Sequence, residues 1–158
     1  MELILWRHCE AEDGEPDAQR RLTARGRADA ARMASWLASR LAADARIIAA
    51  PAVRTQQTAA ALGRPFETVR DLAPGAGVDD VLRAAGWPST PFVLVVGHEP
   101  TLGDVAGALL DGGARSRPLH KGQVVWLSNV GAGASTARLV AAMDPDAVAG
   151  ARGRYGGA

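Results

Sequence analysis

The sequence predicts a three-layer α/β/α protein, with a mostly parallel central sheet and helices on both of its faces. One observation is that short apolar runs, such as residues 3–6 and 92–96, alternate with segments of helical periodicity. The other is that these runs are continuously apolar, whereas a strand with one solvated face would alternate. Both observations are typical of βαβ units whose strands are buried on two sides.

Each element is predicted from its own local signals. The expected strands are residues 3–6, 46–49, 66–69, 92–96, 124–127 and 137–140, of which the last two are antiparallel additions. The expected helices are a five-turn helix capped by Thr23, one from Pro51 to about Leu62, a short one over 78–85, and one over about 101–111. Residues 9–21 and 70–77 are expected to be loops, because they carry charge, glycine and proline.

Size and composition place the chain among single-domain soluble proteins. Its 158 residues predict one domain over residues 1–146, followed by a flexible tail over 147–158. The formal net charge of +1 argues against nucleic-acid or membrane partners. No apolar run approaches the roughly 20 residues of a membrane helix, no signal peptide is evident, and Cys9 is the only cysteine. The expected location is the cytoplasm.

Arginine and histidine follow three of the predicted strands. Arg7 and His8 come after the first strand, Arg54 comes shortly after the second, and His98 comes after the strand over 92–96. Ligands of an open α/β sheet bind outside the carboxyl ends of its strands, so these side chains are expected to gather there. The sequence therefore predicts a cluster of imidazoles and guanidinium groups at one edge of the sheet.

Such a cluster suits phosphoryl transfer without a metal or a cofactor. Guanidinium groups match phosphate oxygens with paired hydrogen bonds, and the helix starts near Pro51 and Thr101 would add backbone N–H groups. One neutral imidazole can attack phosphorus and a second, protonated one can stabilise the transferring group. The residues alone leave open which of His8 and His98 attacks.

Four segments, in this order, resemble the histidine phosphatase superfamily. Arg7-His8-Cys9 resembles its Arg-His-Gly signature, and residues 20–26 resemble Arg-x-Leu-Thr-x-x-Gly. Residues 50–58 resemble Ser-Pro-x-x-Arg-x-x-Gln-Thr, and residues 96–100 resemble Val-x-His-x-Pro. The resemblance spans about residues 3–110 and is similar in spacing to the short SixA-type phosphohistidine phosphatases, which have a phosphoglycerate mutase-like fold.

The resemblance implies roles for individual residues. His8 would be the nucleophile, and Arg7, Arg54 and His98 would complete the phosphate pocket. Arg20 would be a further clamp, which leaves Arg21 as a surface residue. The implied substrate carries phosphate, and a phosphohistidine protein is favoured because the chain leaves little room for a cap over the site.

Two departures from the family pattern have alternative interpretations. Cys9 stands where Gly or Ala is common, and we interpret it as a buried small residue; a reactive thiolate beside the arginines is the alternative. Asp71 is the nearest candidate for the general acid that many members carry, and a loop-capping aspartate is the alternative. A phosphoramidate needs less acid catalysis than an ester, which again favours phosphohistidine.

The sequence also leaves other functions open. A small-molecule phosphomonoesterase or mutase, a metal site built from His8, Cys9 and His98, and a non-catalytic phosphate-binding module are the competing functions. His120 is expected to be an exposed loop histidine, although it could approach the pocket. The acidic stretch over residues 10–17 is expected to be a solvated loop, with recognition of a basic partner as the alternative.

Overall fold

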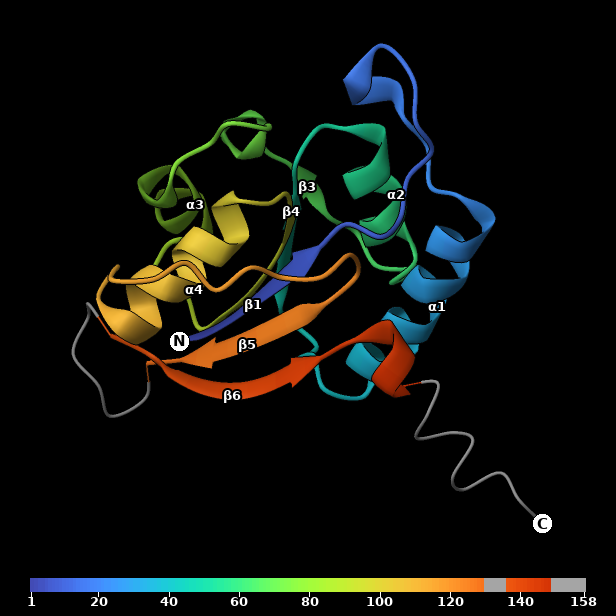
Figure 1. Cartoon of the computed structure of the whole chain (residues 1–158). Helices are drawn as coiled ribbons and strands as arrows, with labels where there is room; N and C mark the ends of the chain where they lie inside the picture. The colour runs from blue at the N-terminus through green and yellow to red at the C-terminus, as the bar shows by residue number, and fades with distance from the viewer. Residues whose placement is uncertain (130–135, 149–158) are drawn as a thin grey trace.

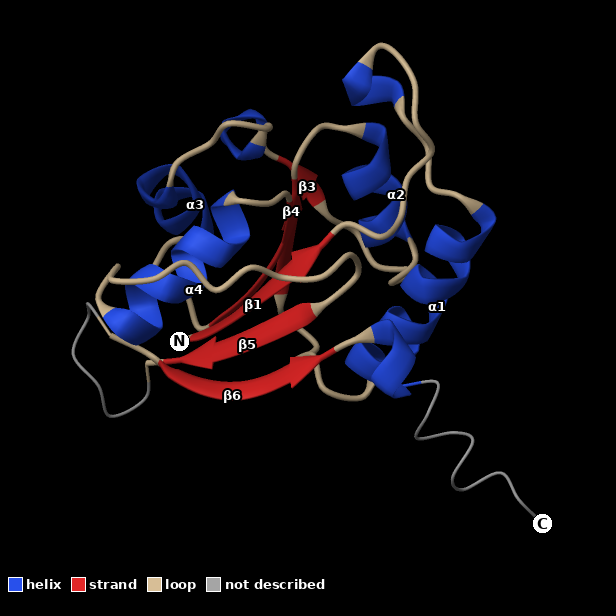
Figure 2. Ribbon diagram, in the orientation of Figure 1, coloured by secondary structure: helices blue, strands red, loops and turns tan. Residues whose placement is uncertain are grey.

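The computed structural model describes residues 1–129 and 136–148, and its elements follow the predicted order. The strands are β1 (Glu2–Arg7), β2 (Arg46–Ala49), β3 (Glu67–Thr68), β4 (Phe92–Gly97), β5 (Val124–Ser128) and β6 (Arg138–Met143). The helices are α1 (Ala24–Ala38), α2 (Val53–Ala60), α3 (Val78–Ala85) and α4 (Thr101–Asp111), with short 3₁₀ turns η1 (Asp17–Gln19) and η2 (Arg70–Leu72). Figures 1 and 2 show this arrangement.

The six strands form one sheet in the order β3-β2-β4-β1-β5-β6. β3, β2, β4 and β1 are parallel, whereas β5 pairs antiparallel with both β1 and β6. The prediction of a mostly parallel sheet with antiparallel additions is therefore confirmed. β2, β4 and β1 are neighbours, so the carboxyl ends of these strands meet at the same edge.

The sheet is covered on both faces, as the continuous apolar strands predicted (Figure 2). On one face, Leu3 and Leu5 of β1 pack with apolar side chains of α3 and α4. On the other, Ile4 and Trp6 pack with side chains of α1 and α2. Successive residues of one strand thus enter opposite cores, which is the period of two of an extended chain.

Element boundaries depart from the expectations in several places, among them the loop predicted over 9–21, which contains η1, and the strand predicted over 137–140, which extends to Met143. α2 begins at Val53, two residues after Pro51, with Ala52 in an extended conformation as its N-cap. α1 ends at Ala38, one turn before the predicted end. The strand predicted over 66–69 is reduced to two exposed residues at the sheet edge, and the loop predicted over 70–77 contains η2.

The chain end is described only in part. Ala147 and Val148 belong to a short helical turn, and Val148 is buried against the core under α1, whereas the predicted tail already includes both residues. The remainder of that tail, residues 149–158, lies outside the described residues. In the described ranges, no helix is both long and apolar enough to cross a membrane.

Candidate phosphate site

The sheet brings His8 and His98 together. Arg7 pairs with Gly97 in the β1–β4 register, and the His8 N–H donates to the Gly97 carbonyl oxygen at 3.1 Å. The residue after each strand end therefore projects to the same place. The two imidazole ring centroids lie 5.4 Å apart, with the ring planes at 60°.

A hydrogen bond to the backbone of the next residue, Cys9, holds His8 as one tautomer. Its Nδ1 lies 2.8 Å from the Cys9 carbonyl oxygen, which can only accept a hydrogen bond. The neutral ring therefore carries its proton on Nδ1 and presents an unprotonated Nε2. Burial lowers the pKa of His8 to about 3, and the charges of His98, Arg54 and Arg7 act in the same direction. The result is a neutral imidazole with a free lone pair.

His98 is also kept neutral by its surroundings. Burial lowers its pKa to about 4, and Arg54 is the largest charge acting in that direction, while Asp17 acts against it. Its Nε2 is buried and has no hydrogen-bond partner among the described residues. An anion that binds beside this ring would oppose the arginine charges and favour a proton on His98.

The arginines present unused donors inside the site. The Nε atoms of Arg7, Arg20 and Arg54 are buried and, within the described part of the chain, make no hydrogen bond. Arg54 is only 5% exposed, and Arg7 is oriented by donating from Nη1 to the Leu119 carbonyl oxygen at 2.8 Å. Buried donors without partners are costly, and an oxyanion is the ligand that would satisfy guanidinium groups.

The motif residues around Arg54 fasten the loop after β1 onto α2. Thr58 Oγ1 accepts from the Cys9 N–H at 3.2 Å and donates to the Arg54 carbonyl oxygen at 2.8 Å. Gln57 Oε1 accepts from the Leu22 N–H at 2.8 Å. The Gln57-Thr58 pair therefore fixes the loop that follows His8, and this role is structural.

The Thr-x-x-Gly part of the second motif serves the start of α1. Thr23 Oγ1 caps the helix by accepting from the Gly26 N–H at 2.9 Å, as predicted. Gly26 lies against the Glu10 carbonyl oxygen so closely that any Cβ atom would overlap it. α1 can approach the loop after β1 only because residue 26 is glycine.

Asp17 is a site residue that the sequence interpretation missed. We expected it to be one of several solvated acids, but Arg54 Nη2 donates to Asp17 Oδ2 at 3.0 Å and Arg54 Nη1 to the Asp17 carbonyl oxygen at 2.9 Å. Arg20 Nε lies 3.4 Å from Asp17 Oδ1. These hydrogen bonds and charges lower the pKa of Asp17, the hydrogen bond from Arg54 most of all. The Asp-x-x-Arg spacing from Asp17 to Arg20 was the available signal.

Glu99 is a second carboxylate beside the site. Its Oε1 accepts from the Gly103 N–H at 2.9 Å, and its charge interacts with Arg7. Burial raises the pKa of Glu99, whereas its backbone hydrogen bonds and Arg7 lower it. Glu99 thus helps to orient Arg7 and the start of α4, and its place between His98 and Pro100 was the only hint in the sequence.

The remaining candidates lie elsewhere. Asp71 is exposed on η2, and no hydrogen bond or ion pair in the described part of the chain joins it to the histidines, so its role as a general acid stays a prediction. Arg21 is exposed, as expected. Cys9 is fully buried, and burial, the largest cause, raises the pKa of its thiol to about 12. This contradicts the alternative of a reactive thiolate.

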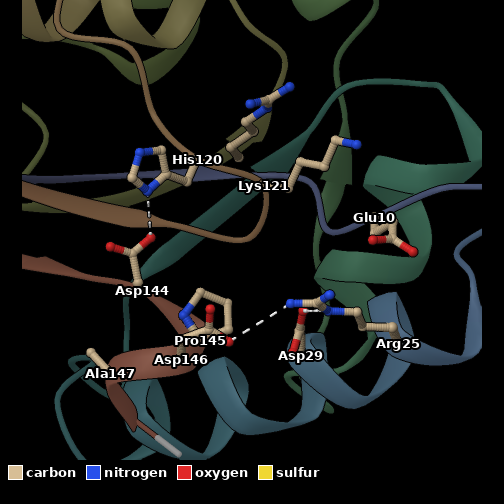
Figure 3. A pocket seen from close by; sticks show the side chains of 10 residues that line it. Glu10, Arg25, Asp29, His120, Lys121, Asp144, Pro145, Asp146 and Ala147 are labelled. Atoms are coloured by element: carbon tan, nitrogen blue, oxygen red, sulfur yellow. Dashed lines mark hydrogen bonds and ion pairs between the residues drawn. The ribbon is translucent and has the colours of Figure 1, made fainter. Parts of the chain in front are cut away.

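A pocket of about 660 Å³ lies next to Arg7 (Figure 3). It is lined by Arg7, Glu10, Arg25, Asp29, His120, Lys121, Asp144, Pro145, Asp146 and Ala147. His120 is exposed, as predicted, and its Nδ1 lies 3.1 Å from Asp144 Oδ1. The loop that carries His120 is attached to His8, because the Gly122 N–H donates to the His8 carbonyl oxygen at 3.1 Å. The pocket thus extends the site without including its two buried histidines.

Metal ligation finds no support in the geometry of the described residues. No three His, Cys, Asp or Glu side chains within 1–129 and 136–148 are grouped so that they could hold a metal ion. The Cys9 thiol is fully buried and lies close to Gly122. The candidate set of His8, Cys9 and His98 is therefore not assembled as a metal site.

Part of the chain matches the model of a known protein family. The model of the histidine phosphatase superfamily (branch 1) matches residues 3–74. The resemblance to the histidine phosphatase superfamily is confirmed. The matched segment contains Arg7, His8, Arg20 and Arg54, whereas His98 lies beyond it. A comparison with curated protein sequences finds no significant match.

Solved histidine phosphatase structures resemble the whole described fold. The protein histidine phosphatase SixA complexed with tungstate has a TM-score of 0.78 and 22% identity, covering 92% of this chain and 98% of that one. A protein from Nakamurella multipartitia assigned as SixA has a TM-score of 0.75 and 26% identity, covering 91% and 95%. A phosphoserine phosphatase from Entamoeba histolytica, in complex with 3-phosphoglyceric acid, has a TM-score of 0.68 and 13% identity, covering 89% and 95%. The fold is phosphoglycerate mutase-like, and the match of residues 3–74 to the superfamily model supports a phosphatase-type enzyme.

Proposed function

We propose that this histidine phosphatase removes phosphate from phosphohistidine on a protein, with His8 as the nucleophile and without a metal. The observation that carries the proposal is the free Nε2 of His8 beside buried nitrogen atoms of Arg7, Arg20, Arg54 and His98 that lack partners. The similarity to SixA structures supports the substrate class. One of those relatives is complexed with tungstate, a tetrahedral oxyanion like phosphate.

The first step follows from the tautomer of His8. Its Nε2 lone pair forms a bond to phosphorus while the bond from phosphorus to the substrate nitrogen breaks, and that electron pair stays on the leaving imidazole. Arg7, Arg20 and Arg54 bind the equatorial oxygens, and His98 with a proton stabilises the charge on them. The leaving imidazole already carries a proton in its reactive form, so the step does not require Asp71.

The second step regenerates the enzyme. Water attacks the phosphorus of phospho-His8, the bond from phosphorus to Nε2 breaks, and its electron pair returns to Nε2 as orthophosphate forms. The proton that water loses passes to the phosphate oxygens or to solvent. The hydrogen bond from Nδ1 to Cys9 keeps the ring in the same orientation through both steps.

A side-by-side assay tests the substrate class. Phosphohistidine protein, phosphoramidate, and a panel of phosphosugars, nucleotides and aryl phosphates are compared by kcat/KM in excess chelator. We expect the phosphohistidine protein to be preferred and the chelator to have no effect. Faster turnover of a free phosphosugar or nucleotide would favour the small-molecule phosphomonoesterase or mutase, and no turnover of any substrate would favour the non-catalytic phosphate-binding module.

A trapping experiment tests the nucleophile. Rapid acid-free quenching with radiolabelled phosphoramidate should give a phosphoenzyme in the native protein and none in His8→Ala. His120→Ala is the matched control, because His120 is exposed and lies outside the buried pair. Burst labelling that survives His8→Ala would overturn the assignment.

A further inference from the structure

The clamp arginine Arg54 already has an anionic partner within the chain. Both of its terminal nitrogens donate to Asp17, one to the carbonyl oxygen at 2.9 Å and one to Oδ2 at 3.0 Å. Arg54 is buried, whereas the Asp17 side chain is 58% exposed. An exposed carboxylate therefore covers the outer edge of a buried cation.

The same carboxylate also reaches the second clamp. Arg20 Nε lies 3.4 Å from Asp17 Oδ1, so one carboxylate bridges Arg20 and Arg54. The Nε atoms of both arginines are nevertheless buried without hydrogen-bond partners. Asp17 thus engages the terminal nitrogens of Arg54 and lies next to Arg20 Nε, while Arg54 Nε stays buried without a partner in the described residues.

A bound phosphate would meet this carboxylate as a competitor. Arg54 is limited to five N–H donors, and two of its nitrogens are engaged by Asp17. A negative charge on the same guanidinium groups also repels a second anion, and partial burial makes that repulsion stronger than in water. Because Arg54 is held by burial and by the backbone of α2, its position does not depend on the carboxylate charge alone.

We propose that Asp17 is an internal counter-carboxylate of the phosphate pocket, which competes with the bound oxyanion for Arg54 and Arg20 and so weakens the binding of product phosphate. The proposal rests on the proposed function in one respect, namely that the pocket binds an oxyanion. It adds a residue that acts through the arginines and sets how tightly product is retained. Without Asp17, only Glu99, beside Arg7, would oppose the charge of these groups, and the site would bind phosphate more tightly and release it more slowly.

Direct binding of inorganic phosphate tests the proposal. Asp17→Asn keeps an oxygen acceptor for Arg54 and removes the charge, so we expect roughly five- to tenfold tighter phosphate binding by isothermal titration calorimetry. The inhibition constant for vanadate should fall by a similar factor. Asp17→Glu, which retains the charge, should not tighten phosphate binding.

Asp13→Asn is the matched control. Asp13 is an exposed aspartate of the same loop, and no hydrogen bond or ion pair of its side chain occurs in the described ranges. We expect less than a twofold change in phosphate affinity, so a larger effect at Asp17 reports its contact with the arginines. A general reduction of negative charge would change both variants equally and would overturn the proposal.

The direction of the effect distinguishes competition from simple support. If Asp17 only positioned Arg54, Asp17→Asn would weaken phosphate binding. Unchanged or weaker phosphate binding by a folded Asp17→Asn protein would therefore overturn the proposal. Asp17→Ser, with the same expectation, replaces Asp17→Asn if that variant does not fold. Calorimetry measures phosphate binding without turnover, so it separates the two proposals. No phosphate binding by the native protein would count against the proposed function itself. Tighter binding by Asp17→Asn would support the role of Asp17 even if the protein had no phosphatase activity.

Discussion

The imidazole rings of His8 and His98 lie 5.4 Å apart at the carboxyl ends of adjacent strands, and both are buried. Their pKa values are lowered to about 3 and about 4, with burial as the first cause in each case. In the unfolded chain both return to the ordinary histidine pKa near 6.5. The folded protein therefore binds fewer protons than the unfolded chain between these values.

This difference predicts loss of stability in acid. Because the unfolded state takes up the extra protons, the free energy of unfolding should fall as pH drops from about 6.5 towards 4, and a one-unit pKa shift corresponds to about 1.4 kcal/mol. We expect a decrease of several kcal/mol, with uptake of up to two protons on unfolding. Urea titrations at a series of pH values measure both. A pH-independent stability over this window would contradict the buried neutral pair.

The control for this prediction is His120→Asn. His120 is exposed and lies outside the buried pair, so an equal change of slope in this variant would show that the slope does not belong to His8 and His98. His98→Asn should reduce the slope by about one proton in the same window. Added phosphate should make the free energy of unfolding fall less steeply with decreasing pH, because an anion in the pocket favours protonated His98.

Much of the fold was predictable because the strands are buried on both faces. Residues 3–6 and 92–96 carry no polar side chain, so their strand character was evident, and the histidines were expected to gather because each follows such a strand. The order of the strands was not predictable from local pattern. That order places His8 directly beside His98, and it arises from long-range pairing of β1 with β4.

The missed features depend on the path of a loop. Asp17 resembles its acidic neighbours in sequence, and only the turn η1 brings it over the start of α2 to Arg54. The short length of β3 also depends on its place in the fold. Its residues lie at the sheet edge and are exposed, so an apparent strand pattern over 66–69 lacks a second neighbour to extend it.

Replacing Arg54 by lysine should be severe although it preserves the charge. Arg54 engages Asp17 with two nitrogens and keeps a third, Nε, buried without a hydrogen-bond partner in the described part of the chain, and a single ammonium group cannot reproduce this fork. We expect Arg54→Lys to lower kcat/KM for phosphoramidate by about 10²-fold, near 3 kcal/mol in the transition state. Steady-state kinetics with a thermal unfolding curve on the same preparation measure the effect.

Arg21→Lys is the control for that variant. Arg21 is exposed and adjacent to the second motif, so its replacement should change kcat/KM by less than twofold. If kcat/KM fell equally in Arg21→Lys and Arg54→Lys, the loss would not be specific to the hydrogen bonds of Arg54.

Gly26 is predicted to be essential for the approach of α1 to the loop after His8. A Cβ atom at residue 26 would overlap the Glu10 carbonyl oxygen, a backbone atom that cannot turn aside. We expect Gly26→Ala to lower the free energy of unfolding by about 1–3 kcal/mol despite the better helix propensity of alanine. Gly77→Ala is the control, since its Cβ would make only an ordinary contact, at 3.5 Å from Asp80 Oδ2. A neutral Gly26→Ala in urea titration would show that the loop can move away.

Cys9 is predicted to be unreactive in the folded protein. The side chain is fully buried, and desolvation raises the pKa of its thiol to about 12, so almost no thiolate exists near neutral pH. We expect a thiol-specific disulfide reagent to label none of the native protein over an hour and one thiol per chain in denaturant. Peroxide should not inactivate the enzyme through this residue, and Cys9→Ser should leave its peroxide sensitivity unchanged. Rapid labelling of the native chain would instead mean that the loop after β1 opens readily, because the Cys9 side chain is fully buried in the closed structure.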